Sequence, residues 1–176
     1  MIYFKVLKVE KLNNILSENL LLYCKGKYQG EKLTESLFAY ESLYLLYKEK
    51  TGKTLPEITF LNGKPTCGEI AVTLSHSSGV VGVGFSTNKD SQIAIDIEKV
   101  TKKREKVASL LGLSNNVANS EFFTLWTQKE CLKKALNISL LTNENIEFFG
   151  ESKIININGQ NYALSVYAKE DYEIIL

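Results

Sequence analysis

Apolar residues recur every three or four positions in two long segments of the chain, and this spacing predicts two amphipathic helices. The first covers residues 31–50 and ends at Gly52, and its apolar positions are Leu33, Leu37, Tyr40, Leu43, Tyr44 and Tyr47. The second covers residues 121–136. Shorter helices are expected at 11–23 and 107–111, with a loop at 24–30 between the first short helix and the first long one. Apolar segments without helical spacing predict strands at 2–9, 58–60, 71–75, 80–85, 93–98, 146–149, 153–157, 162–168 and 172–176.

The order of these elements repeats along the chain. When the two long helices are superposed, Leu37 matches Phe122, residues 58–60 match 146–148, and residues 74–75 match 164–165. Two related halves, or a chance likeness between two α+β stretches, would both give this order. We predict an α+β fold, a pseudo-dimer of similar halves at 1–90 and 91–176 packed as one globular unit. Each half would pack a long helix on a small, mostly antiparallel sheet, with an active-site cleft between the halves.

The composition narrows the functional class. Of the 176 residues, 44% are apolar and 23% charged, as in globular domains. The 21 Lys and Arg residues nearly balance the 20 Asp and Glu residues, which argues against a nucleic-acid-binding polycation. The three cysteines are far apart and there is one histidine, so we expect buried reduced thiols rather than disulfides or a zinc site. No apolar run has the roughly 20 residues of a membrane span, and we expect a cytoplasmic, monomeric protein.

Two acidic residues share one face of the strand expected at 93–98. Side chains alternate along a strand, so Ile93, Ile95 and Ile97 would point into a core, with Asp96 and Glu98 on the other face. The two carboxylates would lie about 6–7 Å apart and repel each other unless a cation lies between them. Mg²⁺ is the hard cation that such oxygen ligands favour. The alternative is a solvated strand face with no ligand.

The second long helix carries a further acid beside lysines. Glu130 and Lys134 are four residues apart and would lie together at the border of the apolar face. A surface ion pair explains them equally well. Lys129 falls inside the apolar arc, where a cation requires an anionic partner or a cleft.

The only histidine, His76, lies in a short segment rich in hydroxyl groups, with Ser75 before it and Gly79 shortly after. A Ser-His hydrolase is a weak interpretation, because no G-x-S-x-G motif is present. A tight turn with small hydroxyls, a glycine and a histidine would instead suit a phosphate group. Lys64, in a predicted turn at 62–65, would add a positive charge, although the chain has no P-loop motif.

Four motifs in order resemble the 4′-phosphopantetheinyl transferases of the surfactin-synthetase-activating type. They are Gly63-Lys64-Pro65, Leu74-Ser75-His76-Ser77, Ile95-Asp96-Ile97-Glu98 and Trp126-Thr127-x-Lys129-Glu130-x-x-x-Lys134. Members of that family are pseudo-dimers that bind coenzyme A in the cleft between their halves. They transfer its phosphopantetheine arm to a serine of an acyl, peptidyl or aryl carrier protein and release adenosine 3′,5′-bisphosphate.

The resemblance implies a role for each matching residue. Asp96, Glu98 and Glu130 would coordinate Mg²⁺, with Mn²⁺ as an alternative, and Glu130 would be the base for the incoming serine hydroxyl. The phosphates of coenzyme A would be held by Lys64, Ser75, His76, Lys129 and Lys134, with the 3′-phosphate at His76 and the pyrophosphate at Lys134. The implied partners are coenzyme A and an apo carrier protein, with no nucleic acid and no membrane.

One departure from the family keeps a second function open. Family members carry arginines just before and within the first long helix, whereas residues 30–40 contain none here, and only Lys25, Lys27 and Lys32 are available nearby. A non-catalytic relative that binds coenzyme A or a carrier without transfer is therefore the alternative. A third possibility is another Mg²⁺-dependent enzyme acting on a nucleotide pyrophosphate.

Overall fold

The computed structural model describes residues 1–103, 105–113, 116–138 and 146–176. Its helices are α1 (Glu18–Lys27), α2 (Gly30–Thr51), α3 (Glu105–Leu110) and α4 (Asn119–Leu136). Its strands are β1 (Ile2–Lys8), β2 (Thr59–Leu61), β3 (Lys64–Thr66), β4 (Ala71–Ser77), β5 (Val80–Ser86), β6 (Ala94–Lys99), β7 (Gly150–Ile157), β8 (Gln160–Tyr167) and β9 (Tyr172–Ile175). This mixture of helices and mostly antiparallel strands confirms the predicted α+β class.

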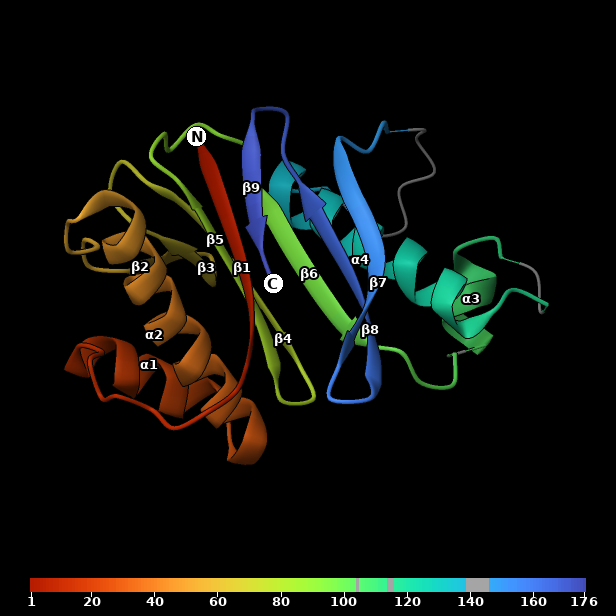
Figure 1. Ribbon diagram of the computed structural model, residues 1–176, viewed down its shortest axis with the longest axis horizontal. Coiled ribbons are helices and arrows are strands. Elements are labelled where there is room, and N and C mark those ends of the chain that lie inside the picture. The colour runs from red at the N-terminus through yellow and green to blue at the C-terminus, as the bar shows by residue number, and fades with distance from the viewer. Residues whose placement is uncertain (104, 114–115, 139–145) are drawn as a thin grey trace.

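The strands form two larger sheets and one small hairpin. One sheet has the order β4-β5-β1-β9, the other has the order β6-β8-β7, and β2 pairs with β3. The pairs are antiparallel except for β1 and β9, which run parallel from Ile2 opposite Tyr172 to Lys5 opposite Ile175. The last strand of the chain therefore lies beside the first, as Figure 1 shows in blue and red.

Each long helix packs on a different sheet. Helix α2 contacts β4 and β5, and α4 contacts β6 and β8. Figure 1 shows α1 and α2 at one end of the molecule and α3 at the other, with the strands of both larger sheets between them. Ile93, Ile95 and Ile97 lie in a core that includes residues of β1 and β8, as their alternation predicted. None of the helices in the described part of the chain has the length and apolar character needed to span a bilayer.

The first short helix begins later than its apolar pattern suggested. Residues 11–16 are irregular, with Asn14 in the left-handed region at φ 57°, and α1 begins only after Ser17, whose hydroxyl accepts a hydrogen bond from the backbone N–H of Leu20. The expected helix at 11–23 and loop at 24–30 are therefore wrong in their bounds. The buried Glu41 of α2 explains the irregular segment, because it accepts hydrogen bonds from the backbone N–H groups of Asn13 and Ile15. The expected strand at 146–149 is also absent, and β7 begins at Gly150.

Strands β4 and β6 lie side by side but are joined through side chains rather than through a backbone ladder. Three hydroxyl groups on alternate residues of β4 accept hydrogen bonds from backbone N–H groups on alternate residues of β6. The pairs are Thr73 with Ile95 at 3.1 Å, Ser75 with Ile97 at 3.3 Å, and Ser77 with Lys99 at 3.1 Å. The contact between the two larger sheets therefore depends on the residue types in β4.

Because the cysteine thiols are buried, we expect the fold to lose stability in alkaline solution. Cys24, Cys67 and Cys131 are all buried, and burial raises the pKa of Cys24 and of Cys67 to about 11. Burial also raises the pKa of Cys131 above its ordinary value. These thiols ionise at lower pH in the unfolded chain than in the folded protein. Their contribution to the free energy of unfolding is therefore complete below pH 9 and is lost as the pH rises towards 11.

Urea unfolding under reducing conditions, repeated from pH 8 to pH 11, measures this effect. We expect the free energy of unfolding to fall over that range, and to fall less steeply in the Cys67→Ala variant. A free energy of unfolding that stays constant up to pH 11 contradicts the prediction.

Candidate functional site

A cavity of about 650 Å³ lies among α2, the β2–β3 hairpin, β4 and the end of α4. Four of the residues proposed from sequence line it, namely Lys64, Ser75, His76 and Lys134. Lys27 and Lys89 also line it, and the acidic residue among its described lining is Asp90. Lys89 pairs with Glu69 and Lys134 with Asp96, whereas Lys27 and Lys64 hydrogen-bond the neutral side chains of Tyr23 and Asn137. The positive charges of Lys27 and Lys64 make this cavity suited to an anionic ligand.

Asp96 of β6 is the most constrained acidic group next to this cavity. The residue is 5% exposed, and its Oδ1 accepts hydrogen bonds from Ser75 Oγ at 2.8 Å and from Lys134 Nζ at 2.7 Å. Its other oxygen, Oδ2, is buried and has no hydrogen-bond partner among the described residues. Buried carboxylate oxygens are almost always paired, so Oδ2 has the capacity to bind a cation or a donor that enters with a ligand.

Lys134, in the last turn of α4, ties this helix to both β4 and β6. Besides Asp96, its Nζ donates to the backbone carbonyl oxygens of Leu74 at 3.3 Å and Ile95 at 2.9 Å. Burial lowers the pKa of this ammonium, but the Asp96 carboxylate together with Cys131 and Glu130 raises it, and the net effect is a pKa above its ordinary value. Lys134 is therefore a fixed positive charge on the wall of the cavity.

Helix α4 is held in this place by polar contacts with β8. The hydroxyls of Thr127 and Ser165 are both fully buried and lie 2.7 Å apart. One turn further along α4, the thiol of Cys131 donates to the backbone oxygen of Ser165 at 3.2 Å. These contacts fix the rotation of α4, and so determine that Lys134 faces Asp96.

The other two acidic residues proposed from sequence have different partners. Glu98 accepts a hydrogen bond from Ser77 Oγ at 2.9 Å, while Glu130 lies 3.5 Å from Lys133 Nζ. The surface ion pair between Glu130 and Lys134, which was the alternative to a functional role for these two residues, is not formed, because Lys134 turns to the buried Asp96. Within residues 1–103, 105–113, 116–138 and 146–176, no three acidic, histidine or cysteine side chains come close enough to hold a metal ion. Glu130 nevertheless lies near enough for its charge to raise the pKa of Lys134.

His76 lies in strand β4 rather than in the turn that follows it. Its Nδ1 is 2.8 Å from Glu35 Oε2, and its Nε2 is 3.2 Å from Ser36 Oγ. The turn is formed by Ser78 and Gly79, both with positive φ, and the N–H of Gly79 donates to Glu35 Oε1 at 2.6 Å. The expected phosphate-binding turn is therefore corrected, because this N–H is already used and only His76 and Ser75 reach the cavity wall.

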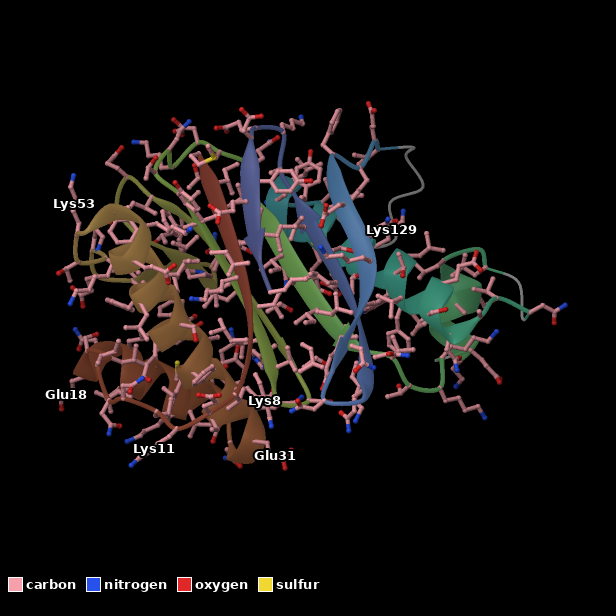
Figure 2. The ribbon with its side chains drawn as sticks, in the orientation of Figure 1. Lys8, Lys11, Glu18, Glu31, Lys53 and Lys129 are labelled. Carbon is pink, nitrogen blue, oxygen red and sulfur yellow. The ribbon has the colours of Figure 1, made fainter. Side chains whose placement is uncertain are left out.

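The two remaining lysines differ in their relation to the cavity. Lys64 lines it, and its Nζ donates at 2.6 Å to Oδ1 of Asn137, the residue that caps the C-terminal end of α4. This bond connects the β2–β3 hairpin with α4. Lys129 is not among the lining residues, and Figure 2 shows its side chain on the far side of the molecule from α2.

The sequence interpretation missed Glu35 and Ser36 as residues of this site. Both are buried in α2, at 7% and 3% exposure. Ser36 lies four residues before Tyr40 and seven before Leu43, which places a hydroxyl within the apolar stripe of the helix. A polar residue inside an apolar stripe was the available signal.

Comparison of the chain with protein-family models and with curated proteins found no match.

Proposed function

We propose that this protein is a Mg²⁺-dependent 4′-phosphopantetheinyl transferase acting on coenzyme A and an apo carrier protein. The observation that carries the proposal is the environment of Asp96. Its carboxylate is buried, one oxygen is held by Ser75 and Lys134 from the cavity wall, and the other oxygen is unpartnered among the described residues. An unpaired buried carboxylate oxygen beside a lysine-lined cavity suits a cation that arrives together with a phosphate-bearing ligand.

The carboxylates near the cavity are the type of ligand that Mg²⁺ requires. Mg²⁺ in enzymes is usually held by one or two carboxylates and completes its shell with water and substrate phosphates. Asp96 Oδ2 would be one ligand, and Glu98 and Glu130 would complete the set by rotating away from Ser77 and Lys133. Mn²⁺ prefers the same ligand types. When bound, the ion would offset negative charge on the pyrophosphate of coenzyme A.

The chain's own residues would position the reaction. Lys64, Ser75 and Lys134 line the cavity and would hold the pyrophosphate, with His76 at the 3′-phosphate. The serine oxygen of the carrier would attack the β-phosphorus in line, while Glu130 takes the hydroxyl proton. As this bond forms, the bond between the β-phosphorus and the bridging oxygen would break, and adenosine 3′,5′-bisphosphate would leave. Fixed positive charges near the pyrophosphate would stabilise the transition state, because they need no reorganisation during the step.

The finer architecture is part of the same proposal. The α2 layer on β4 and β5 and the α4 layer on β6 and β8 would be the two halves of a pseudo-dimer, divided near residue 90. The cavity, which takes residues from both segments, would be the cleft between them. We further propose a monomer in the cytoplasm.

The experiment is a mass measurement of apo acyl, peptidyl and aryl carrier proteins incubated with this protein, coenzyme A and Mg²⁺. We expect at least one carrier to gain one phosphopantetheine, with loss of the gain in EDTA. Calorimetry with coenzyme A runs in parallel. No gain on any carrier, together with no binding of coenzyme A by folded protein, overturns the proposal.

One observation favours a second function, in which coenzyme A or a carrier is bound without transfer. Glu98 is hydrogen-bonded to Ser77 and Glu130 is paired with Lys133, and within the described residues no three acidic, histidine or cysteine side chains are gathered closely enough to hold a metal ion. Tight binding of coenzyme A without any carrier mass gain would support this function over the transferase.

A further inference from the structure

Glu35 is a buried carboxylate to which the proposed reaction gives no role. It lies on α2 and is 7% exposed. Its two oxygens have separate partners on the β4–β5 hairpin: Oε2 is 2.8 Å from Nδ1 of His76, and Oε1 accepts from the N–H of Gly79 at 2.6 Å. Charged groups are buried at this level only when they are paired, so this pairing is a built feature of the cavity wall.

The carboxylate determines how the ring of His76 is presented. A carboxylate accepts hydrogen bonds only, so the ring nitrogen that faces it must carry a proton. Nε2 is then the nitrogen beside Ser36, and Ser36 and His76 both line the cavity. The ring of Tyr28 packs against the His76 ring in a T-shaped arrangement, with 6.0 Å between ring centroids.

The cavity therefore has two separate sets of polar groups. Successive side chains of a strand point to opposite sides, and Ser75 faces Asp96 on β6 while His76 faces Glu35 and Ser36 on α2. Lys134 belongs to the Ser75 set through Asp96. A ligand that fills the cavity would meet the two sets with different groups.

We propose that Glu35 is a positioning residue that directs Nε2 of His76, together with the Ser36 hydroxyl, towards a terminal phosphate of the ligand. This inference rests on the proposed function, which places the 3′-phosphate of coenzyme A at His76. Both ring nitrogens donate when the ring carries its second proton, and Glu35 then supplies the balancing negative charge. Glu35 therefore makes the protein selective for coenzyme A over 3′-dephospho-coenzyme A without touching either ligand.

A second glutamate of α2 provides a matched control. Glu41 is 2% exposed, and its oxygens also accept backbone N–H groups, from Asn13 at 2.7 Å and Ile15 at 3.2 Å. Unlike Glu35, it makes its hydrogen bonds to residues 13 and 15 rather than to His76. Glu41→Gln therefore removes a buried charge from the same helix without altering His76.

The test compares the wild-type protein, Glu35→Gln and Glu41→Gln by calorimetry with coenzyme A and with 3′-dephospho-coenzyme A. We expect Glu35→Gln to reduce the affinity ratio of the two ligands about tenfold, by analogy with the lower end of the loss seen when the residue that orients a metal-ligating histidine is removed. Glu41→Gln should keep the wild-type ratio even if its melting temperature falls.

The single histidine allows a direct spectroscopic reading of the same inference. Nitrogen-15 spectra of the wild-type ring should show a protonated Nδ1, and the Nε2 signal should move with coenzyme A but much less with the dephospho ligand. If Glu35→Gln fails to fold, these spectra of the wild-type protein still test the positioning role of Glu35.

The outcomes separate this inference from the proposed function. Carrier modification with an unprotonated Nδ1, or with the wild-type affinity ratio in Glu35→Gln, overturns the positioning role and leaves the transferase standing. No carrier modification and no ring response to coenzyme A overturns both.

Discussion

Replacing Asp96 with asparagine should lower carrier modification by about 10³-fold, comparable to losing a principal electrostatic group of an active site. The asparagine amide would place N–H donors where Oδ2 now lies without a partner, and an amide nitrogen does not ligate Mg²⁺. The variant should also be less stable by about 3 kcal/mol, because Lys134 loses its buried partner. That figure is the low end of the usual range, since the Lys134 side chain is 31% exposed.

A double variant separates these two effects. Asp96→Asn combined with Lys134→Met removes both charges of the pair, and replacing a buried ion pair by neutral groups of similar volume is often close to neutral for stability. Urea unfolding should therefore show recovered stability, while carrier modification should stay at least as low as in Asp96→Asn, because the double variant lacks both Asp96 and Lys134. A wild-type rate of transfer in Asp96→Asn alone would show that the metal assignment is wrong.

Adding one methyl group at Gly84 should destabilise the fold by on the order of 3 kcal/mol, the upper part of the range for overpacking a core. Gly84 lies in β5 directly opposite Phe4 of β1, and the Phe4 ring covers the glycine. A Cβ at this position would press on that ring and lie 3.0 Å from the carbonyl oxygen of Tyr3. Neither can move easily, because Phe4 is fully buried and the Tyr3 oxygen is backbone.

A glycine-to-alanine substitution in α1 is a matched control, and we expect it to change stability in the opposite direction. Gly26 lies in α1, and a Cβ built there meets no atom within 4 Å. Gly26→Ala should raise stability by about 0.5–1 kcal/mol, because alanine loses less backbone entropy in a helix. Equal effects of the two substitutions in chemical denaturation would contradict the packing argument.

The elements that the sequence predicted well are those with a long regular pattern. Helix α2, helix α4 and the alternating isoleucines of β6 follow from their spacing alone. The start of α1 could not be predicted from spacing, because Asn14 and the capping Ser17 interrupt the helix while the apolar pattern continues across them. The pairing of β9 with β1 joins residues at opposite ends of the chain, and no local signal specifies such a pairing.

The sequence predicted which residues line the cavity better than it predicted the partners of those residues. Spacing on a helix favoured the local pair Glu130 and Lys134, yet Lys134 pairs with Asp96, 38 positions away in the chain. Likewise, His76 was expected in a turn that binds phosphate, whereas its ring is held by Glu35 on α2. Contacts of this kind depend on how helices are rotated against the sheets, which is set by tertiary packing rather than by local spacing.

The parallel pairing of β1 with β9 has a consequence for how the chain is made. During synthesis β1 is made before β5 and long before β9, so β5 can pair with one edge of β1 while the other edge of β1 stays open until residues 172–175 have been made. An open strand edge next to the apolar residues Ile2, Phe4 and Val6 is a template for pairing with another chain. Loss of the β9 residues 172–175 would leave that edge of β1 uncovered and favour aggregation.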